Sequence, residues 1–447
     1  MEDATKRVAA LIERARKAQA AFEYWSQEQV DTLTKALVWT AVKPGNIEAI
    51  SKLAVEESQL GNYQSKYTKL QKKLRGALRD MTGKKSVGII DEDTEKGIIK
   101  IAKPVGVIGA LIPCTNPEAT PVFMSISAIK GRNAIILAPH PRTKKTNAYI
   151  ASLLRETLKK YGAPEDLIIA MEEPSMEDSG ALMKQCDLIV ATGGTPLVKV
   201  AYSSGTPAYG VGAGNAVVIV DETADIAEAA HKIMLSKTFD FATSCSSENS
   251  ILVVDAIYDR LMAALTAEGG YLVDAEGKKK LQNLLWEDGH LSRNVTAQPA
   301  ARLAAMAGIE LPEGRSFFMV PETGVGPDFP FSGEKMCVVL TVYRVADFNA
   351  AVDMVNAITS FQGMGHSCGL YSVDRDRIVE LGLRTKVSRI MIRQPQCYGN
   401  TGNWENGMPF TMTLGCGTWG GNITTENVHW KHMINVTWVS LPIVEKI

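Results

Sequence analysis

The N-terminal part of the chain carries apolar residues at helical spacing. Between Val8 and Phe22 they recur every three or four positions, which predicts an amphipathic helix. Ser26 followed by Gln29 has the pattern of a capping box, and it predicts a second helix that ends near Ala41, before a Pro-Gly pair.

A third helical run, over 64–81, is rich in basic residues. A basic face can meet a phosphorylated ligand, but we interpret this one as solvated, because charge runs on helices usually face water. The basic residues are Lys66, Lys69, Lys72, Lys73, Arg75 and Arg79.

From residue 86 the hydrophobic period changes from helical to extended. Two runs, 87–91 and 97–102, predict a β-hairpin. Short apolar runs then alternate with helical patterns, which predicts a parallel sheet with helices on its faces. Strands are expected at 105–112, 134–138, 167–170, 188–191 and 216–220, and helices at 121–130, 144–161, 176–184, 196–203 and 224–237. A second cycle has strands expected at 250–254, 337–343, 369–372 and 389–392, so the predicted fold class is α/β with two domains.

Composition excludes several classes of protein. The chain has 447 residues, 45% of them hydrophobic, which is enough for two or three domains. Lys plus Arg total 48 and Asp plus Glu 49, a balance that argues against a nucleic-acid-binding protein. No apolar stretch approaches the roughly 20 residues of a membrane span, and residues 1–22 lack the apolar region of a secretory signal. Seven cysteines without a C-x-x-C motif argue against a disulfide scaffold, so we expect a soluble cytoplasmic protein.

Two glycine-rich stretches lack the context of a dinucleotide fingerprint. Gly210, Gly212 and Gly214 precede a predicted strand, whereas a phosphate-binding turn leads from a strand into a helix. The second stretch, 415–421, has no clear helix after it. We interpret both as tight loops.

No metal site is expected. His429 and His432 are three residues apart, and His366 and Cys368 two apart. Neither pair has further carboxylates or thiols at the spacing that metal ligands require.

The most informative residue is Cys245, which lies among small polar residues before a predicted strand. A thiolate attacks carbonyl carbon well, and backbone N–H groups can lower the pKa of such a thiol. Taken alone, a cysteine in this position is more often a small core residue. The neighbouring sequence decides between the two interpretations.

Segment 241–250, FATSCSSENS, resembles the nucleophile segment of the aldehyde dehydrogenase superfamily, especially its CoA-acylating branch. The resemblance covers nearly the whole chain, with its motifs in the expected order. These motifs are PVGVIG at 104–109, IPCTNP at 112–117, APHPRTKK at 138–145, ATGGT at 191–195, EK at 334–335, FQGMGH at 361–366 and LGCGTWGGN at 414–422.

The resemblance implies an aldehyde dehydrogenase-like fold and a homo-oligomer, either a dimer or a tetramer. A Rossmann-like cofactor domain is expected over 1–234 and an α/β catalytic domain over 235–422, with 423–447 returning to the first domain or to a dimer interface. The cofactor-binding residues that it implies are Pro113, His140, Arg142, Lys144, Thr192, Gly193, Gly194, Gly212 and Glu334.

The implied chemistry is attack on an aldehyde by Cys245, with the oxyanion held by the Asn116 amide and a backbone N–H. Collapse of the intermediate would pass hydride to the nicotinamide cofactor and leave a thioester. Hydrolytic members then use a glutamate to activate water, but the corresponding segment here, 209–215, contains no carboxylate. Coenzyme A is therefore the expected acceptor. His366 either assists this thiol exchange or is a structural loop histidine.

The choice of nicotinamide cofactor depends on segment 139–145. An acid in this position would bind the 2′-hydroxyl of NAD, but the segment has none. Its basic residues favour a 2′-phosphate, although NAD-using acylating members have a similar stretch. NADP is thus mildly preferred, and NAD remains open.

Segment 394–410 resembles the sulfoacetaldehyde dehydrogenase (acylating) group and is rich in amides and hydroxyls that suit a small anionic aldehyde. The alternatives are a segment that only lines the CoA channel, an acetaldehyde or propionaldehyde dehydrogenase, an acyl-phosphate reductase, or a non-catalytic scaffold. The candidate substrate-binding residues are Arg393, Thr401, Asn403 and Asn406.

Overall fold

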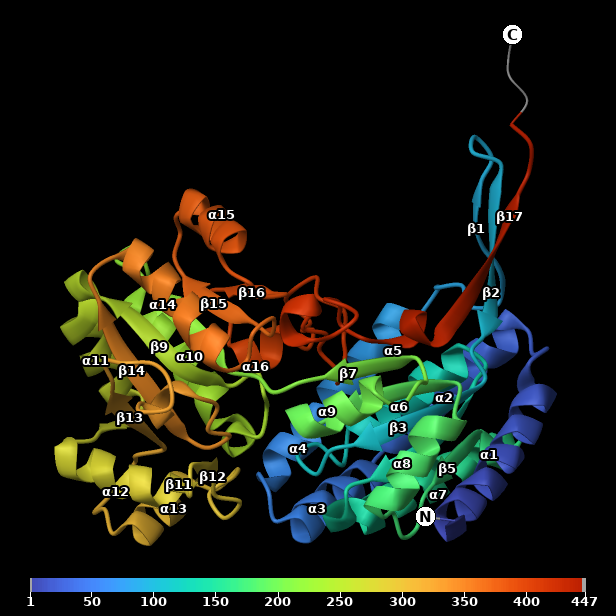
Figure 1. The fold of residues 1–447 in the computed structure, drawn as a ribbon, viewed down its shortest axis with the longest axis horizontal. Helices are drawn as coiled ribbons and strands as arrows, with labels where there is room; N and C mark the ends of the chain where they lie inside the picture. Colours follow the sequence, from blue (N-terminus) through green and yellow to red (C-terminus); the bar gives the residue numbers. More distant parts are fainter. Residues whose placement is uncertain (1, 444–447) are drawn as a thin grey trace.

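The computed structural model describes residues 2–443, which form two α/β lobes and a projecting arm of strands (Figure 1). The first lobe contains a five-stranded parallel sheet, and its two longest strands are buried throughout, as expected of strands covered on both faces. In sheet order the strands are β5 (Ile168–Ala170), β4 (Ala134–Pro139), β3 (Val107–Ile112), β6 (Leu188–Thr192) and β7 (Ala208–Val211).

The N-terminal helices confirm the predicted pattern. Ser26 caps α2 through a capping box, in which its Oγ accepts from the Gln29 N–H and the Gln29 side chain accepts from the Ser26 N–H. The third helical run is α4, a π-helical turn (Leu70–Leu74) and α5. The helices of this lobe are α1 (Glu2–Phe22), α2 (Gln27–Val42), α3 (Asn46–Ser58), α4 (Tyr63–Lys69), α5 (Arg75–Met81), α6 (Thr120–Lys130), α7 (Lys144–Lys160), α8 (Met176–Gln185) and α9 (Thr195–Tyr202).

The interpretation of the basic run as a solvated face is wrong for half of its residues. Lys66, Lys69 and Lys73 are buried, whereas Lys72, Arg75 and Arg79 are exposed. The helical spacing turns Lys66, Lys69 and Lys73 toward the interior. Acidic and carbonyl groups from distant parts of the chain compensate the charges of these lysines there. A local sequence pattern does not reveal such distant partners.

The second lobe has its own hydrophobic core around a seven-stranded sheet, again wholly parallel. In sheet order the strands are β10 (Gly270–Leu272), β13 (Phe317–Pro321), β14 (Val339–Val345), β9 (Glu248–Val254), β8 (Ala216–Val220), β15 (Cys368–Tyr371) and β16 (Ile390–Ile392). A small hairpin, β11 (Trp286–Glu287) and β12 (His290–Leu291), lies outside this sheet. The helices are α10 (Ile226–Thr238), α11 (Tyr258–Ala267), α12 (Ala275–Leu285), α13 (Ala300–Ala307), α14 (Phe348–Phe361), α15 (Arg375–Arg384) and the short α16 (Gln396–Gly399).

The strands and helices that the sequence predicted for the α/β part are present, with ends shifted by at most two residues. The expected division at 234/235 needs a correction, however, because β8 pairs with β9 and β15 in the second sheet. The chain therefore leaves the first sheet after β7. Strands β7, β10 and β13 were not predicted, since they are short or lie in stretches without a clear period.

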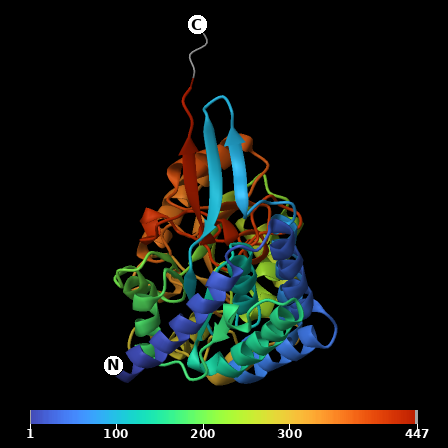
Figure 2. The ribbon, with the colours of Figure 1, turned by 90° about the vertical axis from the view of Figure 1, so that its right-hand side faces the viewer.

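The predicted hairpin consists of β1 (Gly88–Asp93) and β2 (Ile98–Pro104), which project from the body as an arm (Figures 1 and 2). β17 (Ile434–Ser440) pairs antiparallel with β2, so the chain returns to this arm near its end. Of the segment expected to return, 444–447 lie outside the described residues. Among residues 2–443, no helix has the length and apolar character needed to cross a membrane.

The two sheets bring the predicted site residues to facing edges. In the first lobe, Asn116 follows β3 and Gly193 follows β6, both at the carboxyl ends of parallel strands. In the second lobe, Cys245, Glu334 and His366 precede β9, β14 and β15, at the amino ends of parallel strands. The loops that carry the predicted site residues therefore lie between the lobes, because they leave the carboxyl ends of the strands in one sheet and enter the amino ends of the strands in the other.

Candidate active site

The nucleophile segment connects α10 to β9 through an unusual backbone. Asp240, Phe241 and Ala242 all have positive φ, at 51°, 52° and 62°. Such left-handed conformations are costly for residues other than glycine and persist only where the surrounding structure holds them. The side chain of Asp240 supplies part of that support, because its Oδ2 accepts a hydrogen bond from the Thr243 hydroxyl at 2.7 Å.

Cys245 follows this segment and packs against the loop 212–215. A Cβ atom on Gly214 would lie 2.1 Å from the carbonyl oxygen of Cys245, so this glycine is required for close approach of the two loops. The interpretation of this stretch as a tight loop is therefore confirmed for Gly212 and Gly214, whereas Gly210 lies within β7. Gly212 is the first residue after β7 and faces open space.

The Cys245 thiol contacts His366, whose Nε2 lies 3.3 Å from Sγ. Burial raises the pKa of Cys245 to about 12, and the nearby Glu334 carboxylate adds to this effect. Burial also lowers the pKa of His366 to about 3, with a further contribution from Arg389. The free site therefore holds a neutral thiol beside a neutral imidazole at neutral pH.

The other nitrogen of His366, Nδ1, lies 2.9 Å from the Ser367 hydroxyl, which in turn accepts from Asn400 Nδ2 at 2.9 Å. A hydroxyl both donates and accepts, so Ser367 can give its proton to His366 Nδ1 or accept the ring proton from it. His366 Nε2 correspondingly donates to the Cys245 sulfur or accepts the thiol proton, and the ring can therefore exchange a proton with the thiol. Neither Ser367 nor Asn400 was predicted as a site residue.

The second glycine-rich stretch packs against the loop that carries His366. Arg389 is buried and donates to the carbonyl oxygen of His366 at 3.1 Å and to that of Thr425 at 2.9 Å. A Cβ atom on Gly365 would lie 1.9 Å from the carbonyl oxygen of Cys416. This stretch is thus also a tight loop, as predicted, and it fixes the backbone of the histidine.

Asn116 lies half-buried on the loop after β3. Its Oδ1 accepts a hydrogen bond from Lys69 at 2.5 Å, and its Nδ2 donates weakly to Thr115 Oγ1 at 3.3 Å. The same Lys69 ammonium donates to Asp240 in the nucleophile segment at 2.7 Å. The structure therefore brings the predicted oxyanion donor together with the segment that carries the predicted nucleophile.

Glu334 precedes β14 and approaches both Cys245 and the 212–215 loop. Burial raises the pKa of Glu334 to about 8, and a hydrogen bond from the Gly214 N–H opposes that rise. The Glu334 N–H donates to the Gln362 side-chain oxygen at 2.9 Å. A carboxyl group held in this way can accept a hydrogen bond from a ligand hydroxyl in either protonation state.

The predicted cofactor residues lie along the carboxyl edge of the first sheet. Pro113 directly follows β3, and the exposed His140 directly follows β4. Arg142 donates to the Ser58 carbonyl oxygen, and Lys144 forms an ion pair with Glu173 at 2.5 Å. Lys144 is therefore already partly neutralised by an acid that lies outside segment 139–145.

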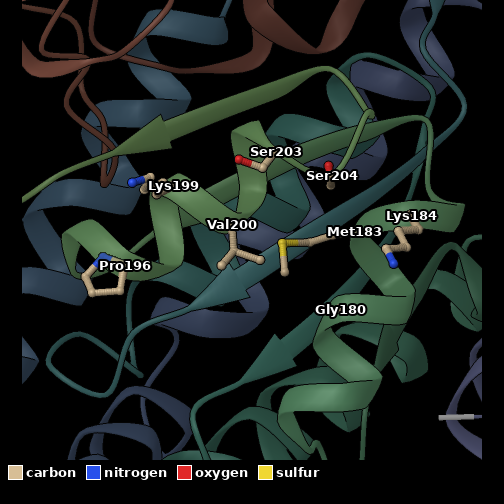
Figure 3. Close-up of a pocket in the computed structure, with 8 residues that line it drawn as sticks. All are labelled: Gly180, Met183, Lys184, Pro196, Lys199, Val200, Ser203 and Ser204. Carbon is tan, nitrogen blue, oxygen red and sulfur yellow. The ribbon is translucent and has the colours of Figure 1, made fainter.

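The loop after β6 and a neighbouring cavity have the form that a dinucleotide needs. Thr192 contacts Thr413 through the two hydroxyls at 3.0 Å, and Gly193-Gly194 leads directly into the N-terminus of α9. Such a turn presents backbone N–H groups to an anion. A cavity of about 420 Å³ lies between α8 and α9 (Figure 3), and its lining residues are Gly180, Met183, Lys184, Pro196, Lys199, Val200, Ser203 and Ser204. An apolar slot beside a glycine turn fits an adenine ring and its phosphates.

Three of the four predicted substrate residues have partners within the protein itself. Arg393 is 44% exposed at its side chain and forms an ion pair with Glu228 of α10 at 2.8 Å. Asn403 and Asn406 bond within their own loop: the Asn406 oxygen accepts from the N–H groups of Asn403 and Met408. These side chains stabilise a turn, as Asn side chains often do. The Thr401 hydroxyl, by contrast, is buried without a hydrogen-bond partner among the described residues.

Sequence reasoning missed the buried charges behind the site. Lys66, Lys69, Glu118 and Asp240 form one buried cluster that contacts Asn116. The signal was the helical spacing of the lysines, which we assigned to a solvated face. Across residues 2–443, no group of three or more His, Cys, Asp or Glu side chains has an arrangement that could hold a metal ion.

Comparison with known proteins agrees with this geometry. The sequence matches the aldehyde dehydrogenase family over residues 2–273. It is 48% identical to a sulfoacetaldehyde dehydrogenase (acylating) of Bilophila wadsworthia, over 98% of this chain and 96% of that protein. A sulfoacetaldehyde dehydrogenase (acylating) of Cupriavidus necator is 43% identical over 99% of this chain and 91% of its own length.

Solved structures agree as well. An acetylating aldehyde dehydrogenase from Geobacillus thermoglucosidasius has a TM-score of 0.96 at 34% identity, covering 100% of this chain and 98% of its own. A propionaldehyde dehydrogenase of Rhodopseudomonas palustris with bound propionyl-CoA has a TM-score of 0.88 at 26% identity, covering 97% of this chain and 94% of its own. Motifs, fold and relatives together establish that the chain belongs to the aldehyde dehydrogenase family.

Proposed function

We propose that this protein oxidises a small aldehyde, sulfoacetaldehyde, to its acyl-CoA thioester with NAD(P) as the hydride acceptor. The main supporting observation is the partly buried contact between Cys245 and His366, beside a segment at 209–215 that offers no carboxylate. A nucleophilic thiol that lacks a general base for water favours transfer to another thiol. The relatives named as acylating sulfoacetaldehyde dehydrogenases support the same assignment.

Each site residue has a defined task in this reaction. Cys245 Sγ attacks the aldehyde carbon as its thiol proton passes to His366 Nε2, and the resulting oxyanion accepts hydrogen bonds from the Asn116 amide and the Cys245 backbone N–H. The bound nicotinamide supplies the hydride acceptor, which leaves a thioester on Cys245. When the CoA thiol attacks that thioester, its proton passes by way of His366 Nε2 to the departing Cys245 sulfur.

A second candidate function is oxidation of acetaldehyde or propionaldehyde by the same chemistry. One observation favours it: Arg393, the cation expected to bind a sulfonate, is occupied by Glu228. A buried sulfonate needs donors or a cation to replace lost water, whereas a methyl or ethyl group needs only apolar walls.

The deciding experiment measures kcat/KM for sulfoacetaldehyde, acetaldehyde and propionaldehyde with CoA, using NAD and NADP in parallel. We expect sulfoacetaldehyde to have the highest value, and we expect free acid to be a minor product. A preference for acetaldehyde would reject the sulfonate assignment alone. Steady turnover to free acid without CoA, at a rate comparable to that with CoA, would reject the acylating assignment.

We propose that the dinucleotide binds with its adenine between α8 and α9 and its phosphates at Gly193-Gly194, with a mild preference for NADP. Arg142 supports this preference because it is exposed and forms no ion pair with an acid among residues 2–443, whereas Lys144 is paired with Glu173. Arg142→Leu should therefore lower kcat/KM for NADP more than for NAD, and Lys144→Leu should have the smaller effect. Equal losses with both cofactors would contradict the 2′-phosphate assignment.

We further propose a cytoplasmic homo-oligomer, either a dimer or a tetramer. The seven cysteines are all free thiols, which is typical of a reducing compartment. The arm exposes apolar side chains on β17, with Trp438 63% exposed, and such surfaces favour association. Light scattering would measure the mass directly, and a monomer at micromolar concentration would reject the oligomer.

A further inference from the structure

The aldehyde chemistry above leaves one buried cluster without a role. Lys66, Lys69, Glu118 and Asp240 lie together at the base of the site, all nearly inaccessible to solvent. Lys69 Nζ is 3.1 Å from Glu118 Oε1 and 2.7 Å from Asp240 Oδ2, and Lys66 Nζ is 2.9 Å from the same Asp240 oxygen. Two lysines and two acids make the cluster electrically balanced, which is the condition for burying charge.

Lys69 is the member of this cluster that touches the predicted oxyanion donor. Its ammonium donates to Asn116 Oδ1 at 2.5 Å. Because an ammonium group has no acceptor atom, only the oxygen of the amide can face it. This contact therefore fixes the orientation of the Asn116 side chain and turns its NH₂ group away from Lys69. A positive charge on the amide oxygen also polarises the N–H bonds toward stronger donation.

The ammonium group of Lys69 stays protonated in this environment. Burial opposes the charged form, but the attraction of Asp240 and Glu118 outweighs burial and raises the pKa of Lys69 above its ordinary value. The lysine thus remains a full cation over the whole range of pH in which the enzyme can be assayed. Its position is also fixed, because Asp240 is held by the N–H of Asn62 at 2.9 Å.

We propose that Lys69 is a positioning residue for catalysis: it orients and polarises the Asn116 amide so that its N–H donates to the oxyanion formed on the substrate. The proposal rests on the proposed aldehyde chemistry. Lys69 does not touch the reacting atoms itself, so its contribution reaches the reaction only through Asn116.

Lys66 provides a matched control. It belongs to the same cluster and contacts the same Asp240 oxygen, but it donates to the backbone carbonyl of Thr115 and not to the Asn116 side chain. Lys69→Met and Lys66→Met can each be combined with Glu118→Gln, which restores the charge balance of the cluster. The two double variants then differ only in which lysine remains.

The test is a mutant cycle with Asn116→Ala, read as the rate of NAD(P)H formation with saturating aldehyde. Removal of an oxyanion donor typically costs about 10²- to 10³-fold, so we expect Lys69→Met/Glu118→Gln to lower kcat about 10- to 100-fold. In the Asn116→Ala background the same change should cost less than about 2-fold, because its effect passes through Asn116. Lys66→Met/Glu118→Gln should change kcat by the same factor in both backgrounds.

The proposal would be overturned if the Lys69 double variant lowered kcat by the same factor in the wild-type and Asn116→Ala backgrounds. It would also be overturned if Lys66 and Lys69 showed the same coupling energy to Asn116.

Alkylation of Cys245 by iodoacetamide should be similar in the two double variants, because both retain one lysine on Asp240. If the methionine variant does not fold, Lys69→Arg keeps the charge and enters the same cycle. A wild-type protein without aldehyde-dependent NAD(P)H formation would reject the proposed function, whereas an active wild type without this coupling would reject only the role of Lys69.

Discussion

The Nε2 atom of His366 lies 3.3 Å from the Sγ atom of Cys245, although 121 positions separate the two residues in the chain. The contact follows from the order of the second sheet. β9 and β15 flank β8 in this parallel sheet, so the loops that precede β9 and β15 emerge at the same edge. A half-buried thiol and a neutral imidazole within hydrogen-bond distance of it form a pair that can exchange a proton, which suits release and recovery of a thiolate.

Replacement of Cys245 by alanine should abolish aldehyde-dependent NAD(P)H formation, because the variant has no atom to form the covalent intermediate. Binding of NAD(P), measured by fluorescence titration, should survive. Cys114→Ala is the control, since Cys114 is also a half-buried thiol but lies on the Asn116 loop of the first lobe. Retention of more than a few per cent of activity in Cys245→Ala would show that the nucleophile is another residue.

Replacement of Ser367 by alanine should lower kcat by about 5-fold, the effect of one lost buried hydrogen bond of roughly 1 kcal/mol. Without this hydroxyl the His366 Nδ1 atom loses the partner that orients the ring, which weakens proton exchange between Nε2 and the Cys245 sulfur. The acyl-transfer step should slow, and rapid-mixing measurements should show a larger burst of NAD(P)H before the steady state. Ser388→Ala is the control, because the Ser388 hydroxyl has no partner among the described residues. Equal effects of the two substitutions would contradict the role of Ser367.

Glu334→Gln should change how stability depends on pH. Burial raises the pKa of Glu334 from 4.5 to about 8, so between these values the unfolded chain has released a proton that the folded protein retains. The contribution of Glu334 to stability is complete below pH 4.5 and is lost as pH rises to about 8. Urea unfolding at pH 5 and pH 8 should therefore show a smaller decrease in stability for Glu334→Gln than for the wild type.

The same substitution should affect the Cys245 thiol, whose pKa is raised by burial and further by the Glu334 charge. Glu334→Gln should accelerate alkylation by iodoacetamide above pH 8, where the carboxylate of the wild type is ionised, and have little effect below it. An unchanged alkylation rate at pH 9 would show that the two groups do not interact.

Arg393→Met should change kcat/KM by less than about 2-fold, equally for sulfoacetaldehyde and acetaldehyde, because exposed ion pairs contribute little. The guanidinium is exposed and faces Glu228, away from the candidate site. Glu228→Gln is the matched variant, since it breaks the same pair from the other side. A selective loss of sulfoacetaldehyde activity in Arg393→Met alone would return this residue to the substrate site.

Much of the fold could be predicted from the sequence, because local patterns reflect local physics. The capping box at Ser26 and the apolar runs of β3 and β4 require only neighbouring residues to be recognised. The β8 strand was also predicted at its observed bounds, but its sheet was not, since an apolar run does not specify which strand it will pair with.

The candidate site also has a part that the sequence predicts and a part that only the tertiary structure shows. The sequence by itself identified Cys245 as the candidate nucleophile, through a motif of residues adjacent in the chain. Only the tertiary structure decided the surroundings of that thiol. The neutral His366, the buried Lys69 on Asn116 and the pairing of Arg393 with Glu228 all depend on partners far away in sequence. The pKa values and hydrogen-bonding roles of charged and polar groups depend on the groups that surround them in space. Burial strengthens this dependence, because it removes the water that would otherwise solvate them.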